Sequence, residues 1–302
     1  MEELLKHCVL CPRKCGADRI SGEKGICGAG AALKVARAAL HNWEEPCISG
    51  RNGSGTVFFS YCPLHCVYCQ NAQIGSGRAG AEITEARLAE IFLELEAQGA
   101  HNINLVTPTH YTPHIACALR RAKEAGLTIP VVHNGSGYES VQTLRLFDGL
   151  ADIYLADFKY MDEKPAGQYS DAPDYAAVAK EALGEMVRQA GEPAFDTEGM
   201  MQRGVIVRHL LLPGHIGDAK KVVRYLYDTY GNRIYLSLMS QYTPLQGERL
   251  PARLRRKVSQ SEYGELVDFA VGLGVENGFL QEGSAASESF IPPFDLTGVS
   301  RE

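Results

Sequence analysis

Six short apolar runs, each followed by a segment with helical periodicity, limit what this chain can fold into. The runs read TVFFS, INLVT, LTIPVVH, DIYLADF, GVIVRHLLL and RIYLSLM, and they begin at residues 56, 103, 127, 152, 204 and 233. Segments with one apolar face follow at residues 84–99, 113–126, 141–147, 175–191, 218–231 and 261–271. Repeated strand–helix units with apolar strands predict a parallel sheet covered by helices. We therefore expect an α/β fold, and six units favour a partial (β/α)6 TIM-like barrel over a complete barrel of eight.

Two parts of the chain lie outside these six units. Residues 1–50 form a small cysteine-rich N-terminal module and a turn-rich connector, with LKVARAAL as a further candidate strand. We place the barrel at residues 51–274 and a C-terminal tail, rich in Gly, Ser and Pro, at residues 275–302. A chain of 302 residues is long enough for a barrel of this size with a small appendage.

Composition and charge exclude several classes of partner. The apolar stretches are short and broken by charges, which predicts no membrane span. The first residues, MEELLKHC, lack a basic start followed by an apolar core, so we expect no secretory or transit peptide and a cytoplasmic protein. The formal charge is −6, and the densest basic cluster, at residues 253–257, is short. The charge pattern therefore predicts neither a nucleic acid nor a membrane as a partner.

Seven of the nine cysteines fall into two tight groups. Disulfides are rare in the cytosol, where clustered cysteines more often bind metal. The first group offers four thiolates, which complete either a structural zinc site or a closed iron–sulfur cluster, and comprises Cys8, Cys11, Cys15 and Cys27. We favour iron–sulfur because the second group requires the same assembly machinery, but the sequence leaves both metals open. Cys47 and Cys117 are interpreted as packing residues.

The second group, Cys62-Pro-Leu-His-Cys66-Val-Tyr-Cys69, directly follows the first predicted strand. In (β/α) barrels the site is built from the loops at the carboxyl ends of the strands. Three thiolates within eight residues can hold three corners of a cubane [4Fe–4S] cluster and leave one iron open for another ligand. The alternative is a zinc site with His65 as the fourth ligand. We disfavour zinc because a tight loop points His65 away from the metal and because the CxxxCxxC spacing is unusual for zinc.

This cysteine loop resembles that of the radical S-adenosylmethionine superfamily. The segment GSGTVFFSYCPLHCVYCQN is similar to the corresponding segment of pyruvate formate-lyase activating enzyme and its homologues. The resemblance continues, in order, through CPRKCGADRISGEKGICGAG, PTHYTPHI, NGSGYES, DIYLADFKYMD, VRHLLLPGH and MSQY. These segments together cover nearly the whole chain and resemble the branch of activating-enzyme homologues that carry extra amino-terminal cysteines.

The resemblance implies a cofactor and a reaction. The open iron would bind the amino and carboxylate groups of S-adenosylmethionine, and one electron from the reduced cluster would cleave the cofactor into methionine and a 5′-deoxyadenosyl radical. The electron would come from a donor such as flavodoxin or ferredoxin. The radical would take a hydrogen atom from a target, either the glycine of a glycyl-radical enzyme or a small molecule or other peptide. The alternative from a different class is a non-catalytic, zinc-binding structural protein.

The resemblance also implies residues that bind the cofactor near the first two strands. Tyr68 matches an aromatic position beside the adenine, and its alternative role is packing under the loop. Thr107 and Thr109 end the second strand, where relatives have a Gly-Gly-Glu segment that binds the methionyl amino group. This chain lacks that glutamate. Either backbone carbonyls and the two hydroxyls replace it, or the segment is a plain strand-ending turn.

The third and fourth strands contribute a further set. Asn134 and Ser136 lie where the activating enzyme has an Asp-Thr-Asn-Gly loop that binds the cofactor and helps to form a cation site. Asn134 replaces that aspartate, so the cation is not implied here. Asp157 and Lys159 end the fourth strand on one face, because alternate residues of a strand share a side. The resemblance implies that Lys159 meets the cofactor's carboxylate, and the alternative is a structural ion pair.

The last two strands complete the candidate site. Arg208 matches an arginine that contacts the cofactor in relatives, and its alternative role is a structural pair with an acidic residue on a neighbouring strand. His209 should face the opposite side and is interpreted as structural. Met239 and Gln241 end the sixth strand and are candidates for the cavity wall, with core packing favoured for Met239. The sequence assigns no catalytic residue.

Overall fold

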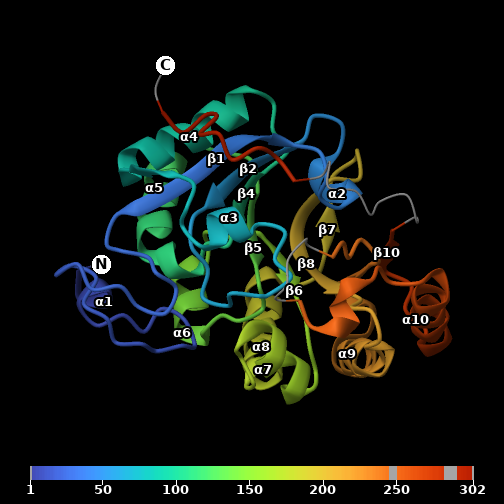
Figure 1. Ribbon diagram of the computed structural model, residues 1–302. Helices are drawn as coiled ribbons and strands as arrows, with labels where there is room; N and C mark the ends of the chain where they lie inside the picture. Colours follow the sequence, from blue (N-terminus) through green and yellow to red (C-terminus); the bar gives the residue numbers. More distant parts are fainter. Residues whose placement is uncertain (1, 245–249, 282–290, 301–302) are drawn as a thin grey trace.

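Figure 1 shows the computed structural model of the chain, which describes residues 2–244, 250–281 and 291–300. The strands are β1 (Leu33–His41), β2 (Ser54–Phe59), β3 (Ala81–Ile83), β4 (Ile103–Val106), β5 (Val131–Gly135), β6 (Ile153–Asp157), β7 (Ala194–Phe195), β8 (Met201–Leu210), β9 (Tyr235–Met239) and β10 (Gly278–Leu280). They form one sheet in the order β10-β9-β8-β6-β5-β4-β2-β1-β3, and β7 pairs with β8 beside this path. Neighbouring strands from β2 to β10 are parallel, whereas β1 is antiparallel to both β2 and β3.

The six predicted strands correspond to β2, β4, β5, β6, β8 and β9, which confirms the α/β class with a parallel sheet. The sheet is open, with β3 and β10 at its two edges. The candidate strand LKVARAAL is β1, which extends the sheet antiparallel to β2 and so starts no strand–helix unit. The third strand was expected from residue 127, but β5 begins at Val131, directly after a proline that has no backbone N–H to donate.

The predicted helices are all present between or after these strands. They are α4 (Glu85–Ala97), α5 (Thr112–Glu124), α6 (Val141–Leu144) with the 3-10 turn η2 (Arg145–Phe147), α8 (Tyr175–Ala190), α9 (Ile216–Tyr230) and α10 (Gln260–Leu273). Side-chain caps set two of the starts: Thr84 accepts the N–H of Arg87 at α4, and Ser259 opens a capping box at α10. Among the described residues, no helix is both long enough and apolar enough to cross a membrane.

Several short elements escaped the sequence analysis. They are α1 (Glu2–Lys6), α2 (Pro46–Ser49), α3 (Ala72–Gly75), α7 (Glu163–Ser170) and the 3-10 turns η1 (Thr109–Tyr111), η3 (Gly231–Arg233) and η4 (Ala252–Arg255). Each spans at most about two helical turns, which is too short for an apolar periodicity to show.

The two faces of the sheet pack against different parts of the chain. The outer face joins the main apolar cluster with the buried stripes of α4, α5, α8 and α9, and contributes Leu105, Val131, Tyr154 and Val205. The inner face contributes a smaller cluster with α2, made of Cys47, Ile48, Val132, Ile153, Leu155 and Ile206. Because alternate residues of a strand share a side, Asn134, Asp157 and Arg208 also lie on this inner face. The helix α2 therefore fills the inside of the sheet next to the candidate site.

Two segments of the C-terminal tail are bonded to the sheet. Strand β10 pairs in parallel with β9. Farther along, the N–H of Leu296 donates to the carbonyl of Ala36, and the carbonyl of Thr297 accepts the N–H of Ala38, so that this segment lies along β1. Figure 1 shows the red C-terminal segment crossing over β1.

Candidate functional site

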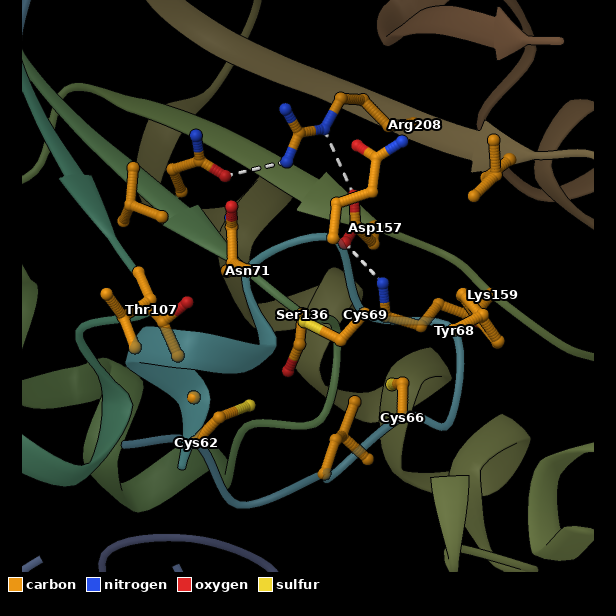
Figure 2. Close-up of a pocket in the computed structure, with 18 of the residues that line it drawn as sticks. Cys62, Cys66, Tyr68, Cys69, Asn71, Thr107, Ser136, Asp157, Lys159 and Arg208 are labelled. Carbon is orange, nitrogen blue, oxygen red and sulfur yellow. Dashed lines mark hydrogen bonds and ion pairs between the residues drawn. The ribbon is translucent and has the colours of Figure 1, made fainter. Parts of the chain in front are cut away.

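A pocket of about 260 Å³ opens at the carboxyl ends of the parallel strands. Its wall brings together most of the residues that the sequence analysis singled out, namely Cys62, Cys66, Tyr68, Cys69, Thr107, Asn134, Ser136, Asp157, Lys159 and Arg208. Figure 2 shows the three cysteines in its lower part, with Asp157 of β6 and Arg208 of β8 above them and Lys159 beside Tyr68. Met239 and Gln241 also line it. Of the predicted cofactor-binding residues, Thr109 alone is not part of the wall.

The three-cysteine loop, residues 62–69, is held by its own turns and by α7. Tyr61 and His65 adopt left-handed φ angles of 73° and 53°, which fold the chain sharply around the cysteines. The N–H of Val67 donates to the carbonyl of Tyr169, 2.9 Å away. The hydroxyl of Ser170 donates to the sulfur of Cys66 at 3.0 Å. The end of α7, which the sequence analysis missed, thus supports the loop directly.

The thiols of this loop are half-buried and lie close together. Burial raises the pKa of Cys62 to about 12 and that of Cys69 to about 11, and the nearby Cys66 adds to both shifts. Backbone N–H groups oppose the shifts, from Leu64 at Cys62 and from Asn71 at Cys69. Sulfurs that receive amide hydrogen bonds suit an iron–sulfur cluster. The irons favour the thiolate form of each cysteine, and the hydrogen bonds tune the reduction potential of the cluster.

The structure also bears on the zinc alternative for this loop. The ring of His65 points away from the pocket, where its Nε2–H donates to the carbonyl of Ile26 at 2.8 Å. Within the described ranges, no three His, Cys, Asp or Glu side chains gather as ligands of one metal ion. In a cubane cluster, by contrast, each thiolate binds a different iron.

In the wall of the pocket, the carboxylate of Asp157 lies between two cations, Lys159 and Arg208. Its carboxylate accepts hydrogen bonds from Lys159 Nζ at 2.6 Å and from Arg208 Nε at 3.0 Å. Burial alone would raise the pKa of Asp157, but the two cations outweigh it and hold that pKa below its usual value. Burial likewise lowers the pKa of Lys159, and the attraction of Asp157 more than restores it. All three groups therefore stay charged at neutral pH.

Two acidic residues of the connector complete this network, and the sequence analysis missed both. Glu44 Oε2 accepts a hydrogen bond from Arg208 Nη1 at 3.1 Å, and the Asn134 amide lies between them, accepting from Arg208 at 2.7 Å and donating to Glu44 at 3.3 Å. Glu45 is fully buried beside them, and burial raises its pKa. In the sequence, Glu44 and Glu45 precede a proline in a turn-rich stretch, a pattern that is typical of a solvent-exposed loop. Only the tertiary fold brings the connector inside the sheet.

Tyr68 is packed on one side and bonded at its hydroxyl. Its OH shares a hydrogen bond of 2.6 Å with Tyr160, whose OH shares one of 2.8 Å with Ser170 Oγ, the donor to Cys66. Its ring meets Tyr242 edge-on, with centroids 6.1 Å apart. A continuous hydrogen-bonded chain therefore runs from the phenol of Tyr68 to a sulfur of the loop. Contact with adenine remains a prediction for this residue.

Thr109 lies behind the pocket, where it contacts a buried acid that the sequence analysis did not single out. Its hydroxyl donates to Glu139 Oε1 at 3.2 Å, and the N–H and hydroxyl of Ser136 donate to the same oxygen at 3.0 and 3.2 Å. Burial raises the pKa of Glu139 to about 7 despite these bonds, and the charge of Asp157 adds to the shift. The only sequence signal was an acid three residues after a loop serine.

Glu139 predicts a pH-dependent stability. A carboxyl whose pKa rises on folding, here from 4.5 to about 7, stabilises the fold fully below pH 4.5 and loses that contribution as the pH rises through 7. We expect Glu139→Gln to be more stable than the wild type by about 3 kcal/mol at pH 8 and nearly equal to it at pH 4.5, measured by urea unfolding. The control is Glu181→Gln, at an exposed position of α8. An unchanged pH profile in Glu139→Gln would contradict this assignment.

The remaining cysteines lie outside the pocket wall. Cys8, Cys11 and Cys27 are buried in the N-terminal module, and Cys15 is exposed beside them. Cys47 is buried in the inner apolar cluster, as expected for a packing residue. Cys117 is half-buried on α5.

Comparison with known proteins places these features in a family context. Residues 48–167, which include the three-cysteine loop, match the model of a 4Fe–4S single cluster domain. Over 277 residues the chain is 24% identical to the uncharacterized protein MJ0674 of Methanocaldococcus jannaschii, an alignment that covers 89% of this chain and 75% of that protein.

Two solved structures have a similar fold. The radical SAM methyltransferase from Sphaerobacter thermophilus aligns with a TM-score of 0.49 at 14% identity, over 76% of this chain and 66% of that one. Streptococcus suis SuiB bound to its precursor peptide SuiA aligns with a TM-score of 0.50 at 12% identity, over 74% of this chain and 46% of that one. The chain thus spans less than two thirds of the methyltransferase and about half of SuiB.

The 4Fe–4S match covers the three-cysteine loop, and the likeness to SuiB extends to the fold alone. Neither match singles out a pyruvate formate-lyase activating enzyme.

Proposed function

We propose that this chain is a radical S-adenosylmethionine enzyme, with a [4Fe–4S] cluster held by Cys62, Cys66 and Cys69. The observation that carries the proposal is one pocket whose wall brings three thiols of a single loop together with Asp157, Lys159 and Arg208. When bound, the cluster supplies one electron that cleaves S-adenosylmethionine into methionine and a 5′-deoxyadenosyl radical. Three protein thiolates leave the fourth iron for the cofactor.

The charged groups opposite the loop suit the cofactor's amino acid portion. Lys159 and Arg208 both reach the pocket wall, and their charges are shared with Asp157. A carboxylate that entered the pocket would gain a charge-assisted hydrogen bond from either cation. The side chains of Asn134 and Ser136 add neutral polar groups at the end of β5. These residues would hold the cofactor in one orientation at the open iron.

The apolar part of the wall has a separate task. Phe59, Leu64, Leu210 and Tyr242 line the same pocket. Apolar side chains keep water away from a reactive centre and strengthen the electrostatic contacts within it. They would protect a carbon radical from quenching before it reaches its target.

The target that we propose is the glycine of a glycyl-radical enzyme, with the electron supplied by a cytoplasmic donor such as flavodoxin or ferredoxin. The support for this choice is the ordered set of segments that resembles pyruvate formate-lyase activating enzyme homologues. Function does not follow from fold alone. The substrate therefore has to be tested separately from the cleavage of the cofactor.

The cleavage test uses the full chain, reconstituted anaerobically with iron and sulfide. We expect the reduced protein to convert S-adenosylmethionine to 5′-deoxyadenosine, measured by chromatography, because the open iron and the reduced cluster are both present. The control is protein loaded with zinc alone. Stoichiometric zinc with no product from the iron-loaded protein would instead support a structural protein.

The substrate test follows from the first. The reduced protein, cofactor and a candidate glycyl-radical enzyme should together give an organic radical signal by electron paramagnetic resonance, and a partner with its glycine replaced by alanine should not. Cleavage that is stimulated only by a small molecule or an unrelated peptide would reject the activase role and leave the radical chemistry intact.

A further inference from the structure

The N-terminal module, residues 7–32, has little of its own to hold it in shape. The structure assigns it no helix or strand. The apolar cluster at its base contains only Leu5, Cys8 and Leu10, with Leu4 at its margin. Segments this short, with so small a core, usually need a disulfide or a metal to fold. Its cysteines are free thiols, which leaves the metal.

Four thiols of the module lie close to one another. Cys11 interacts electrostatically with Cys27, Cys8 and Cys15, and Cys27 interacts in the same way with Cys8 and Cys15. The backbone at Gly25 lies close to Cys15, because a Cβ added at Gly25 would meet the Cys15 sulfur at 2.4 Å. The segment with Cys8, Cys11 and Cys15 therefore lies next to the segment with Cys27.

Backbone amides point at these sulfurs as they do in the three-cysteine loop. The N–H of Arg13 donates to the sulfur of Cys11, and the N–H of Ala29 donates to that of Cys27. Cys62 and Cys69 likewise receive the N–H of the residue two positions farther along the chain. Such bonds stabilise a thiolate bound to metal.

A buried cation beside the cysteines supplies independent support. Arg19 is 1% exposed, and its guanidinium donates to the carbonyls of Gly30 and His110 rather than to a carboxylate. Its Nη1 lies 4.0 Å from the sulfur of Cys8. A buried charge without an opposite charge is strongly unfavourable. Four thiolates around a metal carry net negative charge and would balance this guanidinium.

The module docks directly on the three-cysteine loop. Arg13, between two of its cysteines, donates to the carbonyl of Pro63 at 2.9 Å and to that of Ser170 at 3.0 Å. Pro63 follows Cys62, and Ser170 donates its hydroxyl to Cys66. The side chain of Arg13 therefore contacts both the loop itself and the end of α7 that supports it.

We propose that Cys8, Cys11, Cys15 and Cys27 bind a second metal centre with four thiolate ligands, and that this centre positions the three-cysteine loop through Arg13. The first half stands on the module alone, whereas the second half rests on the proposed function. A [4Fe–4S] cluster and a zinc ion share this ligand chemistry. The cluster fits the described residues better, because no three of their cysteines gather as ligands of one metal ion, whereas each thiolate of a cubane binds a different iron.

The metal content of the full chain tests the first half. A variant with Cys62, Cys66 and Cys69 all changed to Ala should keep about four irons with sulfide, or about one zinc, per chain. Adding Cys11→Ala and Cys27→Ala to that variant should remove this metal, whereas adding Cys117→Ala should not. Iron with sulfide or zinc identifies the centre, and either result supports the site. A triple variant that binds neither, after reconstitution with each, overturns it, whatever the wild type does with S-adenosylmethionine.

Arg13 tests the second half. In the reconstituted holoprotein, the iron that responds to S-adenosylmethionine in the electron paramagnetic resonance spectrum should pass to a chelator about tenfold faster from Arg13→Ala, because the hydrogen bonds to Pro63 of the loop and to Ser170 of α7 are lost. The control is Arg188→Ala, at an arginine whose side chain is 53% exposed. Arg13→Lys, which keeps the charge and one donor, should lie between them. Equal release rates in Arg13→Ala and Arg188→Ala would overturn the positioning role.

Discussion

Replacing Cys62, Cys66 and Cys69 together by alanine is expected to reduce S-adenosylmethionine cleavage to the background of the reductant alone. No other described thiol lines the pocket, so no substitute ligand could hold the cluster there. Product is measured as 5′-deoxyadenosine after anaerobic reconstitution. The variant should still fold, because these side chains line the pocket at the carboxyl ends of the strands and are not part of the main apolar core.

The control for this prediction is Cys117→Ala, which removes a half-buried thiol from α5 and should leave cleavage unchanged. The signal of a reduced cluster that shifts on adding S-adenosylmethionine should disappear from the triple variant and persist in the control. Product formed by the triple variant at the rate of the control would show that the chemistry takes place elsewhere.

Arg208→Ala is expected to lower the free energy of unfolding by about 3–5 kcal/mol. The guanidinium bonds Asp157, Glu44 and the amide of Asn134, and its loss would leave buried carboxylates without a compensating charge. The measurement is urea unfolding of the protein without metal. The control is Lys221→Ala, whose side chain is 57% exposed in its pair with Asp162, so that its loss should change the free energy of unfolding far less.

The deficit of Arg208→Ala should depend on pH in a definite direction. Burial already raises the pKa of Glu45, and Arg208 is the group that most opposes this rise, so the loss of Arg208 would raise that pKa further. A carboxyl with a raised pKa loses its stabilising contribution as the pH rises. The variant should therefore be closer to the wild type at pH 5 than at pH 8. An equal deficit at both pH values would contradict this role of the carboxyl groups. A loss no larger than that of Lys221→Ala would show that the network does not stabilise the fold.

Elements set by local patterns were predicted well. Apolar periodicity and helix caps are patterns of a few neighbouring residues, so they can be recognised without tertiary contacts. They correctly predicted the strands β4, β6 and β9 and the helices α4 and α10. The same holds for the three-cysteine loop, whose ligand spacing is a property of eight consecutive residues.

Residues whose role depends on distant partners were missed. Glu44 is 164 positions from Arg208 along the chain, and nothing near it indicates a buried ion pair. Glu139 reads as a loop acid until the turn after β5 folds it under Thr109. Arg13 was one basic residue among several in a Gly-rich stretch, and its contacts with Pro63 and Ser170 exist only once the module docks.

The amino-acid sequence by itself determined the parallel α/β architecture and the three-thiol loop at the end of its first strand, because periodicity and ligand spacing are local. Only the tertiary structure decided which groups surround that loop. It brought Glu44 of the connector to Arg208 on the inner face of the sheet, joined Tyr68 to Cys66 through Tyr160 and Ser170, and placed Arg13 of the N-terminal module against Pro63 of the loop. These contacts join residues that are far apart in the chain, so they form only when the whole chain packs.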